Sequence, residues 1–414
     1  MHQSPSHGKV SDLCGEQCNP DTATEPPMRG VRDEVAALRN NGITGVANTR
    51  INDPEVIPLW FGEGDLATPD FIRDAAIDAL RRGETFYNHN RGRADLRDAI
   101  KTYLDGLYCV DINPERVTVP GSTMLGINIS AQMALGRGDH GLIVSPAWPN
   151  IESAFQITGA EYEHVRQRQE NGVWRLELED LFDAVKLNTR CIFLNSPCNP
   201  TGWVMRPDEQ QRLLDFCRDR NIWLIADEVY HRTVFDEQVA PSFLSITRDD
   251  DPVVVVSGFS KAWAMTGWRV GWVVAPTYAT EQLGVMSECF NTGATAFVQI
   301  GAVTALEQGE EWVQQLALQY QVGRDITLDA LSDHPRIEML RPEGAFYAFP
   351  RVRGIESSLD FVKGVLAEEN VGLAPGYTFG PGNEQHFRLC FAQSHDRLRE
   401  ALKRVVRYID RLPD

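Results

Sequence analysis

The chain has 414 residues, of which 43% are hydrophobic, and its 58 acidic residues against 40 basic ones give a net charge of −18. A chain of this length and composition buries the core of one large or two ordinary domains, which excludes a disordered or fibrous protein. An acidic surface repels phosphate backbones, and no run of about 18 apolar residues occurs. Neither a nucleic-acid partner nor a membrane span is therefore expected.

The cysteines and the N-terminus bear on the cellular compartment. The first residues lack the charged and then apolar segments of a secretory signal. The eight cysteines are scattered, and only Cys14 and Cys18 stand close together, so neither a disulfide framework nor a metal site is expected. We expect a cytoplasmic protein.

In chain order, polar and turn-forming residues come first and predict a mobile N-terminal arm over 1–30. Short valine- and isoleucine-rich runs then recur, at 117–119, 142–144, 162–165, 191–194, 222–226, 253–256 and 270–274. Continuous apolar runs are typical of strands buried on both faces, and helical periodicity between them, as over 208–220, indicates alternating strands and helices. The expected fold class is α/β, with a mostly parallel seven-stranded sheet sandwiched by helices.

The C-terminal third has a different pattern. A long helical stretch over 312–331 precedes short apolar segments such as 344–347, which indicates a smaller α+β domain. We expect this small domain to be built from both chain ends, from residues 31–64 and 320–414. The large domain would then cover 65–319.

Polar side chains follow the predicted strands at their carboxyl ends, where open α/β sheets bind ligands. They are Ser122 and Thr123 after the first strand, Trp148 after the second, Asn199 after the fourth, Asp227 and Tyr230 after the fifth, and Ser257, Ser260, Lys261 and Arg269 after the sixth. A lysine, a carboxylate, a phenol, an amide, an aromatic ring and an arginine on one rim suit an aromatic, phosphorylated, electrophilic cofactor.

Five segments in this chain resemble the fold-type I pyridoxal-phosphate-dependent aminotransferases of class I/II, the group of the aspartate and aromatic aminotransferases. The segments are Tyr87 with Gly92 and Leu96-Arg97, Asn199-Pro-Thr-Gly202, Asp227-Glu-Val-Tyr230, Ser257-Gly-Phe-Ser-Lys261 with Met265-Thr-Gly-Trp-Arg269-Val-Gly271, and Phe387-Arg388-Leu389. The resemblance runs from Leu59 to Ala392. It implies the cofactor pyridoxal 5'-phosphate.

The resemblance also implies roles around the cofactor ring. Lys261 would form the Schiff base (the aldimine) and shuttle the proton between the substrate Cα and the cofactor. Asp227 would pair with the pyridine nitrogen, Asn199 and Tyr230 would hydrogen-bond the ring hydroxyl, and Trp148 would stack on the ring. Taken alone, each residue has an ordinary structural explanation, such as a helix cap for Asp227 or a turn residue for Asn199.

At the phosphate end, the resemblance implies hydroxyls, a helix start and an arginine. Ser122 and Thr123 stand where a helix is expected to begin, so its backbone N–H groups would face an anion. Ser260 and Arg269 would add a hydroxyl and a fork of donors. Tyr87 would reach the phosphate of the neighbouring subunit, which implies a homodimer.

On the substrate side, Arg388 would grip the α-carboxylate, with Asn199 beside it, and Gly62 would keep space open for the ligand. One departure from the family pattern is Gly258, which stands where many relatives have a hydroxyl residue. Whether Ser257 replaces that hydroxyl is an open question at this stage.

The expected function is transfer of an amino group from an L-amino acid to a 2-oxo acid by a ping-pong mechanism. A β-eliminating lyase uses similar residues and is the main alternative; a non-catalytic amino-acid-binding domain is a third, disfavoured because the N-terminal segment is too short and insufficiently basic for a DNA-binding module. No lysine or arginine occurs in Gly121–Gly126, which favours neutral or aromatic donors. Arg91 and Arg93 are the remaining candidates for recognising an acidic side chain.

Overall fold

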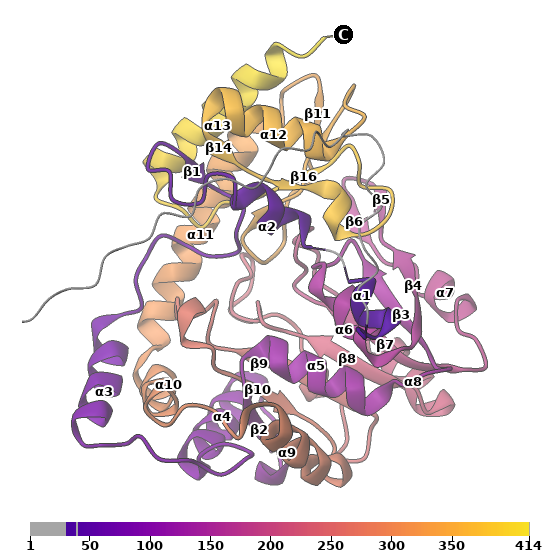
Figure 1. The fold of residues 1–414 in the computed structure, drawn as a ribbon, viewed down its shortest axis with the longest axis vertical. Coiled ribbons are helices and arrows are strands. Elements are labelled where there is room, and N and C mark those ends of the chain that lie inside the picture. Colours follow the sequence, from indigo (N-terminus) through magenta and orange to yellow (C-terminus); the bar gives the residue numbers. More distant parts are fainter. Residues whose placement is uncertain (1–29, 39, 414) are drawn as a thin grey trace, which may run out of the picture.

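The computed structural model describes residues 30–38 and 40–413 (Figure 1). The expected arm over 1–30, with Cys14 and Cys18, lies outside the described residues except for Gly30. Within the described part of the chain, no helix combines the length and the apolar character that crossing a bilayer requires.

The centre of the fold is a seven-stranded sheet in the order β2-β10-β9-β8-β7-β3-β4. Its strands are β2 (Val117–Gly121), β3 (His140–Ser145), β4 (Glu161–Arg166), β7 (Thr189–Asn195), β8 (Trp223–Asp227), β9 (Val253–Gly258) and β10 (Gly271–Val274). All neighbours pair in parallel except β10, which is antiparallel to both β2 and β9. The seven predicted strands and their mostly parallel arrangement are confirmed.

Alternate residues of the central strands are buried on opposite faces of the sheet, which explains their unbroken apolar sequence. In β9, Val254 and Val256 join one core cluster, whereas Val253 and Val255 join the other. Helices α5 (Thr123–Ala134), α6 (Asn150–Thr158) and α9 (Thr277–Asn291) contribute to the first cluster, and α4 (Ala94–Tyr108), α7 (Leu178–Asp183) and α8 (Pro207–Arg220) to the second. The sheet is therefore sandwiched by helices, as predicted.

Strand β4 departs from the expectation of burial on both faces. It is one of the two edge strands of the sheet, with β3 as its one neighbour. Only Val165 of its six residues is buried, and Glu161 and Glu163 are exposed. The expectation is wrong for β4, whose exposed charged residues prevent further strand pairing, whereas β2 at the other edge is buried at all five positions.

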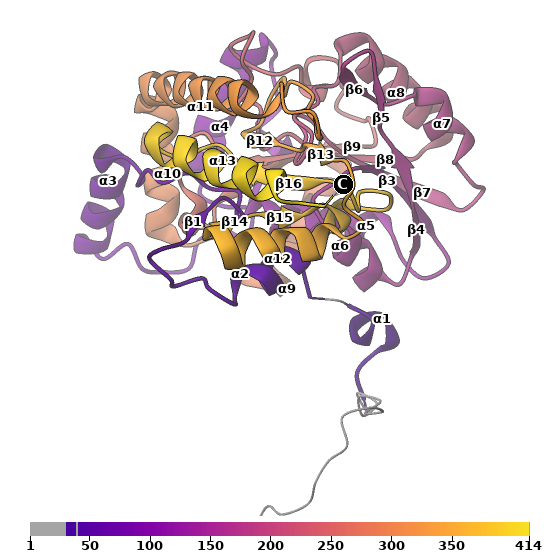
Figure 2. The same cartoon turned by 90° about the horizontal axis from the view of Figure 1, so that it is seen from above.

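Segments from both ends of the chain pack together beside the carboxyl ends of the strands (Figures 1 and 2). Strand β1 (Ile57–Pro58) pairs in parallel with β14 (Val371–Gly372). Helix α2 (Gly42–Ala47) packs against α12 (Ser358–Glu369). The smaller α+β part is thus assembled from both termini.

The other elements of this part belong to the C-terminal third. Strand β16 (Phe387–Cys390) lies between β12 (Tyr347–Ala348) and β15 (Ala374–Pro375). Helix α13 (His395–Asp410) packs on α11 (Glu310–Leu331) and α12. The short pair of β11 (Ile337–Glu338) and β13 (Arg351–Val352) and the turn η4 (Gly376–Phe379) complete it.

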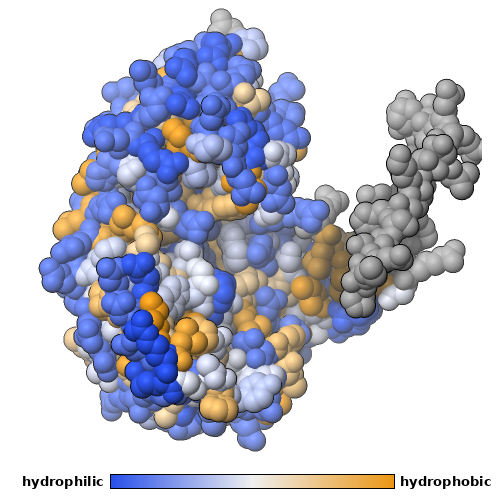
Figure 3. Space-filling view, turned by 60° about the vertical axis from the view of Figure 1, so that its left-hand side comes forward, coloured by the Kyte–Doolittle hydropathy of each residue, from blue (hydrophilic) through white to orange (hydrophobic). Residues whose placement is uncertain are grey.

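Helix α11 (Glu310–Leu331) joins the two parts, running without a break from the level of α10 to the C-terminal helices (Figure 1). It includes the predicted stretch 312–331. Residue 320, where the C-terminal part of the small domain is expected to begin, lies inside this helix. The remaining elements are α1 (Asp33–Ala36), α3 (Asp70–Arg81), α10 (Ala296–Gln308), β5 (Arg168–Glu170), β6 (Val173–Arg175), η1 (Pro114–Arg116), η2 (Phe243–Ser245) and η3 (Thr266–Trp268). Hydrophilic residues cover most of the face in Figure 3, which is hollowed between its upper and lower parts.

Candidate active site

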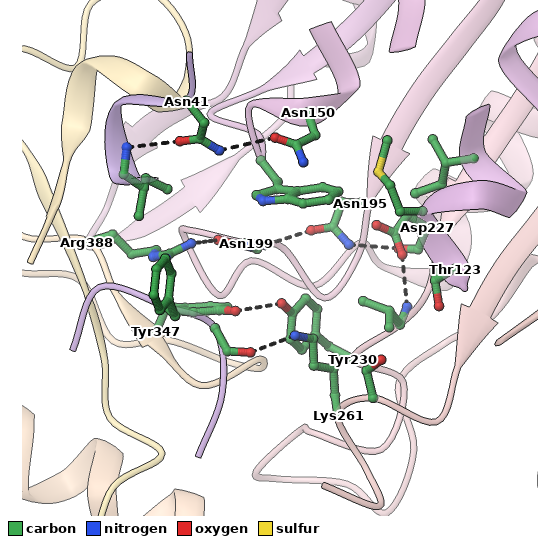
Figure 4. Close-up of a pocket in the computed structure, with 18 of the residues that line it drawn as sticks. Asn41, Thr123, Asn150, Asn195, Asn199, Asp227, Tyr230, Lys261, Tyr347 and Arg388 are labelled. Atoms are coloured by element: carbon green, nitrogen blue, oxygen red, sulfur yellow. Dashed lines mark hydrogen bonds between the residues drawn. The ribbon is translucent and has the colours of Figure 1, made fainter. Parts of the chain in front are cut away.

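A cavity of about 330 Å³ lies at the carboxyl ends of the parallel strands, facing the part built from both termini (Figure 4). Ten residues predicted for the site line it: Gly62, Thr123, Trp148, Asn199, Asp227, Tyr230, Ser260, Lys261, Arg269 and Arg388. Two other predicted residues, Ser122 and Tyr87, are not among its lining residues. The sheet topology therefore gathers most of the predicted set at one place.

Arg269 reaches this rim because β10 runs against its neighbours. It stands two positions before β10, whose first residue, Gly271, pairs with Gly258 at the end of β9. The start of an antiparallel strand lies beside the carboxyl ends of the strands next to it. Arg269 has a φ of 56°, and its Nη1 donates to the Thr266 carbonyl at 2.6 Å.

Lys261 presents its amine to the cavity from the turn after β9. Its Nζ donates to the Gly62 carbonyl at 2.6 Å and lies 5.9 Å and 5.8 Å from the ring centres of Tyr230 and Phe346. Burial lowers the pKa of this amine from 10.5 to about 8. A substantial share of the neutral amine, the form that adds to a carbonyl group, is therefore present near pH 8.

Asp227 ends β8 and places a carboxylate in the cavity wall with only 6% of the residue exposed. Its Oδ1 accepts from the Val229 N–H at 3.1 Å. No arginine or lysine of the described residues forms an ion pair with it, and burial raises its pKa from 3.8 to about 7, although the charge of Lys261 opposes this shift. A buried carboxylate without a cationic partner fits a ligand that brings a protonated ring nitrogen.

Arg388 of β16 is 98% buried and holds its guanidinium between two aromatic rings. Its Cζ lies 4.5 Å from the ring centre of Tyr347 and 5.0 Å from that of Phe379. Nη1 donates to Asn199 Oδ1 at 3.0 Å, Nη2 donates to the Trp60 carbonyl, and Nε has no partner within the described structure. The contact with Asn199 joins the two parts of the molecule. The unpartnered Nε–H of Arg388 is available to a carboxylate.

Tyr347 is a cavity residue that the sequence analysis missed as part of the site. Its hydroxyl lies 2.7 Å from the hydroxyl of Tyr230, so the two phenols share a hydrogen bond inside the cavity. Its position also explains Gly62, because a Cβ at residue 62 would lie 2.0 Å from the Tyr347 hydroxyl. The segment 344–347 had been noted only as an apolar segment, since nothing in its pattern indicates where it packs.

Asn195 is a second missed residue, and it fixes two loops of the site. Its Oδ1 accepts from the Asn199 N–H at 2.7 Å, and its Nδ2 donates to the Asp227 carbonyl at 2.9 Å. The other missed lining residues are Asn41, Ile43, Thr44, Phe61, Met124, Ile127, Asn150 and Val229. Asn41 Nδ2 donates to Asn150 Oδ1 at 3.1 Å, so α2 and α6 meet at the cavity (Figure 4).

The N-terminus of α5 supplies the anion-binding end of the cavity. Thr123 is its first residue and lines the cavity, whereas the Ser122 hydroxyl accepts from the Leu125 N–H at 3.2 Å and so caps the helix. Arg269 and Ser260 lie in the same wall. Together these groups provide oriented N–H donors, a hydroxyl and a positive charge, which is the chemistry that a phosphate requires.

Gly258 and Ser257 have packing roles in this structure. A Cβ at residue 258 would lie 2.3 Å from Thr123 Oγ1 and 3.0 Å from the Gly271 Cα, so the strand ends approach too closely for a side chain. The Ser257 hydroxyl lies 3.2 Å from the Glu228 carbonyl and 3.1 Å from His231 Nδ1. Ser257 is not among the cavity-lining residues, and its side chain does not replace the missing hydroxyl.

Three further residues considered from the sequence lie away from the cavity. Tyr87 is 90% exposed and lines a different hollow, beside residues 291–297. Arg91 pairs with Glu115 at 2.8 Å. Arg93 pairs with Asp95 at 2.7 Å.

The parallel sheet with a lysine, a buried carboxylate and an anion-binding helix start at one rim defines a fold-type I pyridoxal-phosphate enzyme. The family model for aminotransferase class I and II matches residues 54–405 of this chain. The chain therefore belongs to the class I and II aminotransferase family, and it is a pyridoxal-phosphate-dependent aminotransferase.

Individual relatives agree with this assignment. The chain is 30% identical to an aspartate aminotransferase of Pyrococcus horikoshii, over 92% of this chain and 97% of that protein. It is 32% identical to an arginine–pyruvate transaminase of Pseudomonas aeruginosa, over 85% and 89%. Among solved structures, an aspartate aminotransferase of Thermotoga maritima is similar with a TM-score of 0.85 and 28% identity, covering 92% of this chain and all of that one.

Proposed function

We propose that this aminotransferase moves the amino group of a neutral or aromatic L-amino acid to a 2-oxo acid, in two half-reactions at one cavity, with Lys261 as the catalytic base and acid. The observation that carries the proposal is the meeting of Lys261, Asp227 and Arg388 in that cavity. When bound, pyridoxal phosphate supplies an electrophilic carbonyl and an electron-withdrawing ring.

The residues of the chain have separate tasks around the cofactor ring. Asp227 would stabilise a proton on the ring nitrogen. Burial raises the pKa of its carboxyl, because the buried negative charge has no cationic partner, and a protonated ring nitrogen would supply that partner. Asn199 and Tyr230 would hydrogen-bond the ring hydroxyl, and Trp148 would stack on the ring. Lys261 Nζ would take the proton from the substrate Cα and later give it back, as its lowered pKa permits near neutral pH.

The N-terminus of α5 would hold the phosphate. Ser260 would donate a hydroxyl hydrogen bond and Arg269 would supply the charge, while Thr123, whose hydroxyl donates to the Ser257 carbonyl at 3.1 Å, would offer its backbone N–H. Ser122 contributes by capping the helix, which leaves the N–H groups of its first turn directed at the cavity end.

Substrate recognition rests on Arg388 and on the apolar lining. Arg388 binds the α-carboxylate, with Asn199 holding its guanidinium in place. Phe61, Ile43 and Ile127 line the same cavity. Apart from Arg388 and Arg269, no arginine is among its described lining residues. An uncharged donor side chain fits this lining better than a carboxylate does.

The active unit that we propose is a homodimer in which Tyr87 of each subunit completes the other subunit's site. Phe86 and Tyr87 are 83% and 90% exposed, an unusual state for two adjacent aromatic residues. Tyr87 does not line the cavity of its own chain, which leaves its side chain available to a second copy.

The division of the chain into domains and its location are also proposals. We divide the described chain into a small domain, 31–64 with 320–414, and a large domain, 65–319; the pairing of β1 with β14 supports the joining of both ends.

A cytoplasmic location is supported by six described cysteines that form no disulfide, four of them buried.

The first experiment tests the chemistry. Purified protein incubated with pyridoxal phosphate should absorb visible light, and Lys261→Ala should lose the covalent attachment while the variant still melts cooperatively. A panel of donors with 2-oxoglutarate should then give glutamate, with neutral or aromatic donors fastest. Pyruvate and ammonia in place of glutamate would indicate β-elimination instead, and a protein that takes up no cofactor would refute the assignment of Lys261.

A second experiment tests the dimer. Lys261→Ala and Tyr87→Ala subunits are each expected to be nearly inactive alone. Mixed and exchanged, they should regain activity, because one site of the mixed dimer then has Lys261 from one chain and Tyr87 from the other. Absence of recovery in a verified mixed dimer would place Tyr87 in its own chain's site.

A further inference from the structure

A second cleft, of about 760 Å³, lies at the carboxyl ends of β3 and β4, where Pro146 and residues 164–169 line it. One wall consists of residues 164–169, from the edge strand β4 into β5, and the other of residues 382–386, which follow η4 in the C-terminal part. Figure 1 shows β4 and β5 next to this C-terminal part. The two clefts share no lining residue.

Gln167 brings an unused hydrogen-bond donor to this cleft. The residue is 96% buried, and its Oε1 accepts from the Thr201 hydroxyl at 3.1 Å. With Oε1 accepting from Thr201, the other end of the amide is the NH₂ group, which faces the Cys198 thiol, a weak acceptor, and has no oxygen or nitrogen partner within the described structure. A buried donor without a partner costs about 1–3 kcal/mol, which a ligand acceptor would recover.

His386 supplies a second donor of the same kind. Its Nε2 lies 3.3 Å from Gln169 Nε2, which can only donate, so Nε2 of the ring accepts and Nδ1 carries the hydrogen. Burial, with the charges of Arg351 and Arg166, lowers the pKa of His386 to about 4, which keeps this neutral form at pH 7. Nδ1 is buried and has no partner among the described residues.

Arg166 provides the charge. Its guanidinium lies against Gly382, where a Cβ would approach Nη2 to 2.4 Å, and its one hydrogen bond is a long contact of 3.5 Å with the Gly382 carbonyl. No carboxylate of the described chain pairs with it. The other two arginines of the cleft are already neutralised, Arg168 by Asp180 and Arg351 by Glu338.

One lining carboxylate, Glu384, remains to be placed. Its Oε2 lies 3.5 Å from the Ser358 hydroxyl at the start of α12. The carboxylate is thus directed to the N-terminus of that helix, where the helix dipole stabilises negative charge. Arg166 therefore keeps its charge available to a ligand.

We propose that this cleft is a second binding site, for a small anion that carries a carboxylate or a phosphate group. The anion's oxygens accept hydrogen bonds from the Arg166 guanidinium, the Gln167 amide and the His386 ring. Both kinds of group offer several acceptor oxygens and one or two negative charges, which matches two neutral donors and one free arginine.

Calorimetric titration of the cofactor-loaded enzyme with orthophosphate, and separately with glutarate, tests the proposal. Loading with pyridoxal phosphate first fills the active-site phosphate position; glutarate can also bind to Arg388 in the active site, so its binding at the second cleft is the part that Arg166→Gln removes. We expect saturable binding of at least one of the two anions at one site per chain, weakened at least about tenfold in Arg166→Gln and in Gln167→Glu. In Gln167→Glu the Thr201 contact is retained while the donor becomes a carboxylate.

Arg175→Gln is the matched control, because Arg175 lies opposite Arg168 in the same hairpin, is exposed and does not line the cleft. It removes the same charge and should bind as the unmodified enzyme does. Stronger binding of orthophosphate or of glutarate identifies the preferred group. The proposal is overturned if neither anion shows saturable binding, or if Arg166→Gln binds both as tightly as Arg175→Gln does.

Discussion

The hydroxyl of Tyr347 lies 2.7 Å from the hydroxyl of Tyr230, and this bond connects strand β12 of the C-terminal part to the turn after β8. Both rings are buried, and no other hydrogen-bond partner of the Tyr230 hydroxyl occurs in the described structure. The group proposed to bind the cofactor's ring hydroxyl is therefore itself oriented by a residue from the other part of the molecule.

Tyr347→Phe is expected to lower kcat/KM about fivefold, because the loss of a neutral hydrogen bond of about 1 kcal/mol leaves the Tyr230 hydroxyl free to rotate. Steady-state rates with the best donor measure the effect. Tyr320→Phe is the control, since Tyr320 is a buried tyrosine outside the cavity lining. Equal rates in both variants would show that Tyr347 does not orient Tyr230.

Gly62→Ala is expected to be more harmful than a single methyl group suggests. The new Cβ would lie 2.0 Å from the Tyr347 hydroxyl, so the ring or the loop must move. We expect roughly a tenfold or larger loss of kcat/KM, and a smaller loss from Gly62→Ala when Tyr347→Phe is already present, because the closest atom is then gone. Gly45→Ala, with no atom within 4 Å of its Cβ, is the control.

The sequence predicted the sheet because most of its strands contain nearly unbroken apolar runs; β4, with two exposed glutamates, is the exception. It also located the residues of the cavity that follow those strands directly, such as Asp227 and Lys261. Tyr347 and Asn41 could not be found in this way, since they come from the small part and reach the cavity only through tertiary packing. For Ser122, the sequence position was compatible with both a ligand contact and a helix cap, and its hydroxyl is used as the cap.

Asp227→Asn should make the cofactor-free protein more stable at pH 8. The carboxyl of the unfolded chain loses its proton near pH 3.8 and the folded one near pH 7. The folded state therefore binds more protons between these values, and this group's contribution to the free energy of unfolding falls as pH rises, by at most about 4 kcal/mol.

Chemical unfolding of the cofactor-free proteins at pH 4, 6 and 8 measures this effect. The gain in the free energy of unfolding from Asp227→Asn should be largest at pH 8 and fade toward pH 4. In a separate titration, the same variant should bind pyridoxal phosphate more weakly than the unmodified protein does. Asp74→Asn, an exposed acid on α3, should show no such trend. A gain that is independent of pH would mean that the carboxylate is not the destabilising group.

Cofactor uptake should depend on pH through Lys261. Its amine is protonated below about pH 8, and only the neutral form attacks an aldehyde, so the rate of covalent attachment should rise through that pH. Growth of visible absorption after mixing cofactor-free protein with pyridoxal phosphate, from pH 6 to 10, measures it. A simple alkyl amine with an ordinary pKa is the reference, and a midpoint as high as that of the reference would contradict the lowered pKa of Lys261.

Arg388→Lys is expected to raise the KM for the donor roughly tenfold or more while leaving cofactor uptake intact. A lysine keeps the charge but cannot hold Asn199 Oδ1 and the Trp60 carbonyl while it also binds a carboxylate, and it loses the planar stack between Tyr347 and Phe379. Steady-state kinetics with the donor varied, beside the absorption of the bound cofactor, separate the two effects. Arg404→Lys, on α13 and away from the cavity, is the matched control, because Arg404 likewise binds both a side chain, that of Glu400, and a carbonyl, that of Glu369. An unchanged KM would assign Arg388 to holding the two parts together, and another residue would then have to bind the α-carboxylate.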